Sequence, residues 1–389
     1  MFALLYFVQG TILSYFTALN ALYFLARGLT MTSVGIFSTI ALIPFVIKIF
    51  LGMLSDRVNL FGLGNRKPYI LLGLLIQFVC LGVAPFINPA SYYWGFVGLA
   101  FTLQMGMALY DTCTDGLALD TTPQEEQGTI QGFMVGGRAV GVVVTASAVG
   151  LLAQNVSWVA VFWLLAVLTL LPLPFVLRVH EAPRPVEREF EWHAFQAFKQ
   201  VPVIALAGLG LVFFLIIAGA NQLVNPFLQS EYHISLSTAG FFTTIWGIGV
   251  VLGGATGGNL MSKLGDRNAT RFALVLSFFS ILALAAILQP AMAWPLVALF
   301  GIAYGTYQTV YFALAMRYTD PRIAASMFSI LMAVTNVGQG IGLALSGILA
   351  DTTGYRWAFV IITALNVFAL PLMPLVFHRR KMQTLKGVL

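Results

Sequence analysis

Long apolar runs separated by short polar segments dominate the chain. A membrane-spanning helix needs about 20 predominantly apolar residues, and twelve windows of roughly this length can be marked. They cover residues 2–25, 33–54, 69–87, 92–118, 129–152, 156–177, 200–229, 236–262, 270–289, 292–316, 323–350 and 356–377. The first window lacks a basic leading segment and exceeds the apolar stretch of a signal peptide, so we expect it to remain as a helix. The pattern therefore predicts an all-α membrane protein with twelve transmembrane helices.

Composition supports this prediction and excludes other classes of protein. Of the 389 residues, 59% are apolar and 9% are charged, whereas about a quarter are charged in soluble domains. An ordinary soluble enzyme is therefore excluded, as is a disordered or nucleic-acid-binding chain, which would be poor in apolar residues. The two cysteines, Cys80 and Cys113, fall in apolar runs and the four histidines are scattered, so we expect no disulfide framework, metal site or cofactor.

The distribution of basic residues predicts the orientation of the helices. If the N-terminus is cytoplasmic, 16 of the 20 Lys and Arg residues fall in inner loops and the tail, and the outer loops hold only Arg27 and Arg356. Such asymmetry is the positive-inside pattern, and it explains the net charge of +6 without a nucleic-acid partner. We therefore expect a multi-pass protein of the cell (inner) membrane, embedded in the lipid bilayer with both termini cytoplasmic.

The two halves of the chain look like copies. Trp158 and the Leu-Pro-Leu sequence at 171–173 match Trp357 and the same sequence at 370–372, with an offset of 199 residues. We expect an N-terminal six-helix bundle at 1–177, a cytoplasmic linker at 178–199, a C-terminal six-helix bundle at 200–377 and a cytoplasmic tail at 378–389. The linker carries Trp192, Phe195 and Phe198, which favour an interfacial helix.

The loop between the second and third predicted helices carries a recognisable motif. It contains Gly52, Asp56, Arg57, Gly64, Arg66 and Lys67. This motif and the twelve-helix pattern resemble the major facilitator superfamily, which implies two pseudo-symmetric bundles that alternate access to a central site. Residues 1–150 are similar to the folate-biopterin transporter family in the segments 5–10, 47–48 and 55–71 and in Asp111-x3-Asp115-Gly116 with Asp120.

Other branches share parts of this pattern. The Asp-x3-Asp run followed by Arg138 also resembles muropeptide permeases and acetyl-coenzyme A transporters, and Arg138 departs from many folate-biopterin sequences. The segment 64–70 with Gln77 and Phe78 resembles proteins that assist pigment assembly. The resemblance implies a non-enzymatic, monomeric symporter that takes up a small aromatic or anionic solute, such as folate or a pterin, together with protons. Two alternatives are proton-coupled efflux of hydrophobic compounds and a non-transporting assembly factor for pigment or membrane proteins.

Four ionisable residues fall inside predicted helices, where charge is costly unless it is paired or faces a cavity. At 1.5 Å per residue, Lys48, Asp111 and Arg138 lie about 12, 13 and 15 Å from the inner ends of their helices. Asp115 is one turn from Asp111 on the same face. We expect one buried network, serving either as a permanent ion-pair cluster, in proton coupling through Asp111 or Asp115, or in binding an anion at Lys48 or Arg138.

Helices 1, 4, 7 and 10 line the cavity in the resembled superfamily, and each carries polar or aromatic residues here. Tyr304, Tyr307, Gln308 and Tyr311 are spaced i, i+3, i+4 and i+7 and form one stripe. We expect substrate contacts from this stripe, unless the tyrosines merely pack between helices. The other candidates are Gln9, Asn20, Gln104, Asn221, Gln222 and Asn225.

Three residues near inner helix ends are candidates for gating: Asp56, Arg57 and Asp120. Asp56 can latch the halves by sitting against the N-terminus of the eleventh helix, where the helix dipole favours an anion. Alternatively, it pairs only with a loop arginine.

The orientation can be tested by labelling. Single cysteines introduced as Glu187→Cys and Lys386→Cys should react only from the cytoplasmic face, because both positions fall on the basic side of the membrane. Labelling of either position from outside would contradict both the orientation and the twelve-helix count.

Overall fold

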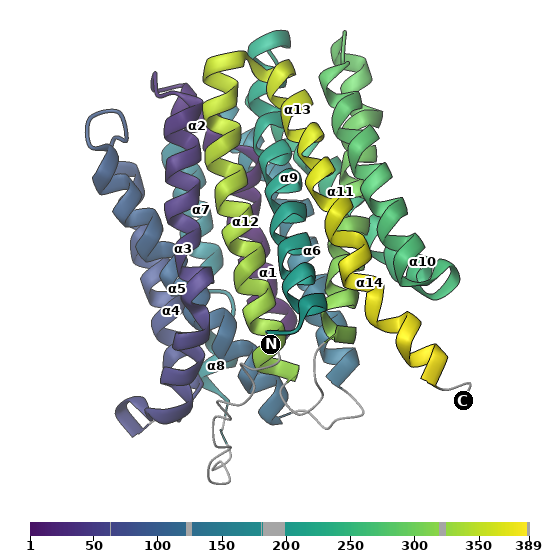
Figure 1. Cartoon of the computed structure of the whole chain (residues 1–389). Helices are drawn as coiled ribbons and strands as arrows, with labels where there is room; N and C mark the ends of the chain where they lie inside the picture. Colours follow the sequence, from purple (N-terminus) through teal and green to yellow (C-terminus); the bar gives the residue numbers. More distant parts are fainter. Residues whose placement is uncertain (63, 122–126, 180, 182–198, 319–323, 387–389) are drawn as a thin grey trace. The chain divides into compact units, whose positions relative to one another are not determined.

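The computed structural model describes residues 1–62, 64–121, 127–179, 181, 199–318 and 324–386, and these contain helices but no strand. The described residues of the first half form these helical elements (Figure 1): α1 Phe2–Ala18, α2 Asn20–Leu25, α3 Met31–Arg57, η1 Leu60–Gly62, α4 Lys67–Val83, η2 Ala84–Phe86, α5 Tyr93–Thr121, α6 Gln127–Asn155, α7 Trp158–Thr169 and α8 Leu173–Leu177. Those of the second half form α9 Val201–Tyr232, α10 Leu236–Ala285, α11 Pro290–Tyr318, α12 Ala324–Thr353, α13 Tyr355–Ala364, η5 Leu365–Phe368 and α14 Ala369–Lys386.

Each of the twelve predicted windows is helical. Within the described ranges, nine helical segments are long and apolar enough to cross a membrane. One of them, α10, covers two predicted windows. Gly265 interrupts it between these windows with φ 72 and ψ 164, a backbone conformation that glycine adopts at little cost. The remaining windows correspond to α1, which is short, and to α5, which carries Asp111 and Asp115.

Large apolar side chains cover the outside of the helices. Phe50, Phe86, Trp94 and Trp357 are each 65–77% exposed. Such surfaces are unfavourable in water and favourable against lipid tails. Together with the apolar helices, they indicate a multi-pass integral membrane protein.

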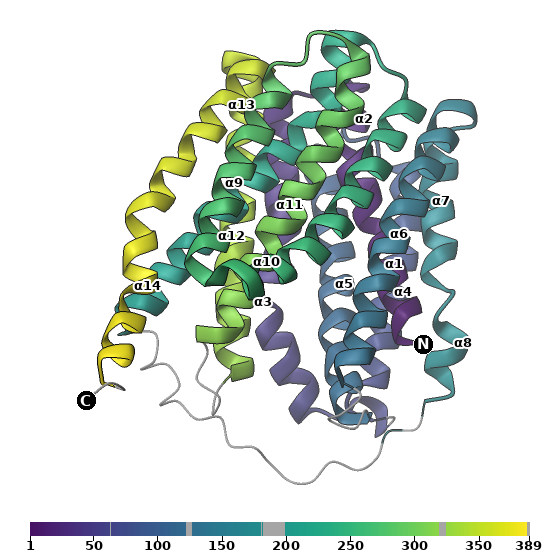
Figure 2. The same ribbon diagram turned by 90° about the vertical axis from the view of Figure 1, so that its right-hand side faces the viewer.

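The chain divides into two compact units, one made of residues 1–186 with 225–247 and the other of 187–224 with 248–389. In the first unit, α3 and α4 both pack on α5 (Figure 1), and α1 packs along α6 (Figure 2). The ends of α9 and α10 that adjoin their connecting loop are grouped with the first unit. The bundle boundaries predicted from the sequence stay a prediction, and the expected interfacial helix of the linker lies outside the described residues.

Glycines allow the closest helix contacts in both units. On α6, a Cβ at Gly137 or Gly141 would lie 2.1 or 2.3 Å from a carbonyl oxygen of α1. On α12, a Cβ at Gly338 or Gly342 would lie 2.2 or 2.1 Å from a carbonyl oxygen of α9. These separations are shorter than any real Cβ contact, so only glycine fits. The same i, i+4 pair in each unit supports the repeat seen in the sequence.

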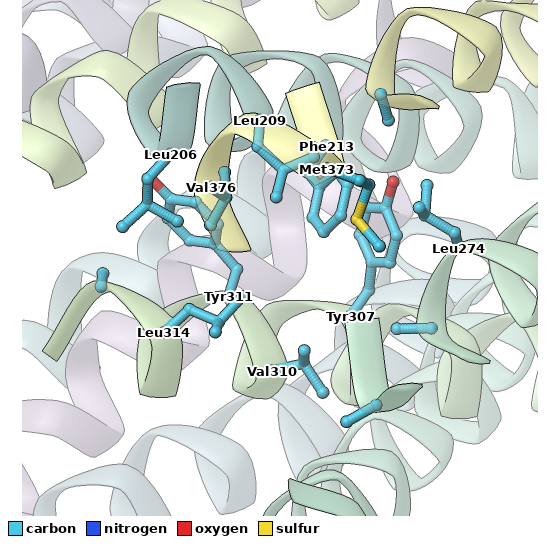
Figure 3. Packing of buried hydrophobic residues seen from close by; sticks show 14 of the residues in the cluster. Leu206, Leu209, Phe213, Leu274, Tyr307, Val310, Tyr311, Leu314, Met373 and Val376 are labelled. Carbon is cyan, nitrogen blue, oxygen red and sulfur yellow. The ribbon is translucent and has the colours of Figure 1, made fainter. Parts of the chain in front are cut away.

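The core of the second unit contains two of the predicted substrate-binding tyrosines (Figure 3). Tyr307 and Tyr311 on α11 are fully buried in an apolar cluster. The ring of Tyr307 stacks on that of Phe213 with centroids 3.8 Å apart, and its hydroxyl donates to Asn366 Oδ1 at 3.4 Å. The ring of Tyr311 packs where only a glycine, Gly210, leaves room on α9. This packing favours the alternative in which these two tyrosines hold helices together.

Substitutions of these tyrosines distinguish packing from substrate contact. Tyr307→Ala should lower the free energy of unfolding by about 3–5 kcal/mol, because it leaves a large cavity in the core. Tyr311→Phe is the matched control and should cost little, since the hydroxyl of Tyr311 makes no hydrogen bond with the described residues. Thermal unfolding in detergent measures both effects. A Tyr307→Ala variant that melts like wild type but fails to bind solute would instead favour substrate contact.

Candidate functional site

An ion pair inside the first unit joins two of the predicted charges. Lys48 on α3 lies with its Nζ 3.4 Å from Asp111 Oδ2 on α5. The other oxygen, Asp111 Oδ1, accepts a hydrogen bond of 2.8 Å from Gln9 Nε2 on α1. The Asp111 side chain is 7% exposed and that of Lys48 is 30% exposed. Lys48 and Asp111 therefore share a depth, as the helix spacing predicted, and Asp111 is held from both sides.

The second carboxylate of α5 has different partners. Tyr6 on α1 donates its hydroxyl hydrogen to Asp115 Oδ1. Asp115 also lies within electrostatic range of Asp111, Lys48 and Arg138. Arg138 on α6 is exposed, and no ion pair joins it to any residue that the structure describes. Helices α1, α5 and α6 thus bring Tyr6, Asp115 and Arg138 together beside the Lys48–Asp111 pair.

Helix periodicity explains why these groups converge. Tyr6 and Gln9 are three residues apart on α1, and Asp111 and Asp115 are four apart on α5, so each pair lies on one helix face. Gln9 therefore meets Asp111 while Tyr6 meets Asp115 one turn away. The glycine contacts between α1 and α6 bring the backbone of Arg138 against α1, since a Cβ at Gly10 would lie 2.2 Å from the Arg138 carbonyl oxygen.

The network is formally neutral. Lys48 and Arg138 supply two positive charges, and Asp111 and Asp115 supply two negative ones. A medium of low dielectric constant penalises each charge that lacks a compensating neighbour, and breaking one pair exposes the other member to that penalty. A change in the charge of one member therefore favours a compensating change nearby, which is the property that ion or proton coupling requires.

A second polar cluster lies at a break in the first predicted helix. Leu19 has φ −123 and ψ −18 and separates α1 from α2. Asn225 on α9 donates from Nδ2 to the Ala18 carbonyl oxygen at 2.9 Å and to Thr243 Oγ1 at 2.9 Å. Asn20 is buried beside the break, and its Oδ1 has no hydrogen-bond partner among the described residues. Asn225 thus satisfies backbone at the break, and substrate contact by Asn20 stays a prediction.

Of the other residues predicted to contact substrate, one joins two helices and four are partly buried. Gln222 donates from Nε2 to the Leu343 carbonyl oxygen at 2.8 Å and to Ser346 Oγ at 3.0 Å, so it joins α9 to α12. Asn221, Gln104, Tyr304 and Gln308 are partly buried. Tyr304 packs against the core cluster of the second unit. For these residues a role in binding stays a prediction.

A cluster of charges lies where α4 begins. Arg66 donates to Ser55 Oγ and, from Nε at 3.4 Å, to Asp120 Oδ2, which is the predicted gating residue at the end of α5. Glu181, which follows α8, accepts the backbone N–H groups of residues 65 to 67 and so caps α4. Gly64 has φ +115, and a Cβ there would strike the Glu181 carboxylate. The conformation and the contact both require glycine at this position.

The second unit has a related pair with the charges exchanged. Asp266 follows the positive-φ Gly265 and is bound by Arg317 near the end of α11. In the first unit the loop supplies the arginine and the helix end supplies the aspartate. The second half therefore makes a similar contact of reversed polarity at Asp266 and Arg317.

Some sequence-based predictions concern residues that the structure does not describe. The side chains of Asp56 and Arg57 are among these, as is the segment before α12 that the Asp56 latch would need. Cys80 and Cys113 are buried and are not joined in a disulfide. Among the described residues, no group of three or more His, Cys, Asp or Glu side chains is arranged to hold a metal ion.

Sequence reasoning missed two residues of these clusters. Tyr6 was part of the segment 5–10 that carried the resemblance, and its i, i+3 spacing from Gln9 was a usable signal. Glu181 gave no such signal, because its partner is the backbone at the start of α4, more than a hundred residues earlier.

Comparisons with known proteins agree with this architecture. The Major Facilitator Superfamily matches over residues 2–329 and again over 223–386. Among solved structures, the nucleoside transporter NupG aligns with a TM-score of 0.80 at 16% identity, covering 97% of this chain and 98% of that one. A D-xylose-proton symporter aligns with a TM-score of 0.74 at 17% identity, covering 95% and 96%. At these identities the likeness shows the fold alone.

Two curated relatives are more informative about sequence. A folate-biopterin transporter of Synechocystis sp. (strain ATCC 27184 / PCC 6803 / Kazusa) is 30% identical over 190 residues, which is 48% of this chain but only 37% of that transporter's length. The anhydromuropeptide permease of Escherichia coli (strain K12) is 22% identical over 392 residues, covering 94% of this chain and 75% of the permease. Since the superfamily match spans most of the sequence and the helices adopt its fold, the chain belongs to the major facilitator superfamily.

Proposed function

We propose that this chain is a proton-coupled importer of a small aromatic or anionic solute, with folate or a pterin as the leading candidate. The observation that carries the proposal is the four-charge network of Lys48, Asp111, Asp115 and Arg138 within membrane-spanning helices. Ionisable groups at such depth are rare and mark ion and proton pathways. The relatedness to a folate-biopterin transporter supports the solute class, and the sequence segments that resemble this family lie in residues 1–150, which contain all four charges.

The physical reason for coupling is the cost of net charge in the membrane. A neutral network can accept an anion at low cost only if a positive charge enters with it, and a proton on a carboxylate meets this requirement. Movement of a proton down its gradient can then drive the solute in the same direction by alternating access. In this proposal the protein is a monomeric transporter of the inner membrane with both termini cytoplasmic, and it catalyses no covalent reaction.

Transport into proteoliposomes tests this function. With acid outside, radiolabelled folate or biopterin should accumulate, and a proton ionophore should abolish the accumulation. Empty liposomes are the control. A nucleoside, a muropeptide and D-xylose should be tested in parallel, because related or structurally similar proteins are named for such solutes.

Other outcomes would identify the alternatives. One relative is a multidrug resistance protein, 22% identical over 88% of this chain, so gradient-driven export of a hydrophobic dye would favour efflux. A folded protein that moves no solute but copurifies with a pigment-binding or membrane protein would indicate an assembly factor. Either result would overturn the proposed import.

The Lys48–Asp111 pair can be tested by removing one charge and then both. Asp111→Asn should lower the free energy of unfolding by about 3 kcal/mol, because it leaves the Lys48 ammonium without its carboxylate. Adding Lys48→Met should restore much of the loss, since neither charge then remains. Melting temperatures of the single and double variants measure this coupling. Equal melting temperatures for wild type and Asp111→Asn would contradict a structural role for the pair.

A further inference from the structure

The two carboxylates of the network have unequal surroundings. Asp111 accepts from the Lys48 ammonium and from the Gln9 amide, so both of its oxygens are occupied. Asp115 accepts at Oδ1 from Tyr6, a neutral hydroxyl. The structure gives Asp115 Oδ2 no hydrogen-bond donor among the described residues, and the residue is half-buried.

This inequality decides where a proton is bound most favourably. Two carboxylates one turn apart repel each other when both are charged. Protonation of Asp111 would displace its bond to Lys48 and leave that cation uncompensated. Protonation of Asp115 at Oδ2 forms an O–H bond, keeps the Tyr6 hydrogen bond at Oδ1 and removes the repulsion. The groups that face Asp115 are Tyr6 from α1, Lys48 from α3, Asp111 from its own helix and Arg138 from α6.

Protonation of Asp115 also changes the environment of Arg138. Arg138 is exposed and makes no ion pair with any residue in the described part of the chain, and the nearby negative charge of Asp115 compensates it only through space. Once Asp115 is neutral, the network carries one net positive charge. A single negative charge on a solute, bound at Arg138, restores neutrality, and guanidinium groups bind carboxylates with paired hydrogen bonds.

We propose that Asp115 is the proton-binding carboxylate of this transporter and that its protonation frees Arg138 to bind one anionic group of the solute, while Lys48–Asp111 remains a fixed ion pair. The proton enters from the acidic side onto Asp115 Oδ2 and leaves from the same oxygen on the other side, together with the anion. This proposal rests on the proposed function and specifies its solute as one with a carboxylate or similar anionic group at that position. One proton and one negative charge then cross together.

An infrared experiment tests the proton site without any solute. In the purified protein, acidification should produce the C=O stretches of protonated carboxyl groups, and Asp115 should contribute one of these bands. That band should be missing from the difference spectrum of Asp115→Asn, whose amide imitates the protonated side chain and keeps an acceptor for Tyr6. It should persist in the Lys48→Met/Asp111→Asn double variant, which is the matched control with its charges removed in balance. Identical carboxyl bands in wild type and Asp115→Asn would overturn the assignment.

A pair of ligands tests the anion site. Pterin-6-carboxylate carries one negative charge and 6-hydroxymethylpterin carries none, while the ring system is the same. Binding of the carboxylate to wild type should weaken by up to about tenfold per pH unit once Asp115 loses its proton, whereas binding to Asp115→Asn should not depend on pH. Arg138→Gln should weaken carboxylate binding by about ten- to hundredfold and leave the neutral pterin nearly unaffected.

The outcomes separate this inference from the proposed function. Equal weakening of both pterins by Arg138→Gln, or pH-dependent binding that persists in Asp115→Asn, would overturn the inference while leaving pterin transport intact. Failure of wild type to bind either pterin would overturn the proposed solute class and with it the role of Arg138. The infrared result would still decide whether Asp115 binds the proton.

Discussion

Charge inside a hydrocarbon layer is the constraint on which the rest of this structure depends. Lipid supplies no water to solvate an ammonium or a carboxylate, so each such group must be matched by another part of the protein. The ion pair between Lys48 and Asp111, with Gln9 on its other side, meets this requirement across three helices. The helix positions in the first unit are therefore set by polar contacts at one depth as well as by apolar packing.

Close packing makes these polar contacts possible. Gly137 and Gly141 let α6 approach the backbone of α1, which brings Arg138 near the residues that hold Asp111 and Asp115. The equivalent glycine pair on α12 brings it against α9 in the second unit. There the core positions are filled by aromatic rings such as Tyr307 and Phe213. Both units thus use a pair of glycines to pack two helices closely. In the first unit this contact lies beside charged residues, and in the second unit the core holds aromatic rings.

This difference gives the halves different chemical capacities. The first unit holds two positive and two negative charges within its helices, and the described charges of the second unit include a pair at a helix end, Asp266 with Arg317. At the start of α4, Glu181 binds backbone N–H groups that would otherwise lack partners. In the proposed function, coupling is therefore assigned to the first unit, while the described core of the second unit is apolar and aromatic.

The sequence by itself determined the helices, because length and hydrophobicity decide which segments cross a membrane, and it placed Lys48 and Asp111 at one depth, because the rise of a helix is constant. Only the tertiary structure decided which face of each helix meets which neighbour. In the folded chain, Tyr307 and Tyr311 are buried in the core, Tyr6 donates a hydrogen bond to Asp115, and Glu181 binds the start of α4. Periodicity defines a helix face, but the partner of that face depends on contacts between residues far apart in the chain.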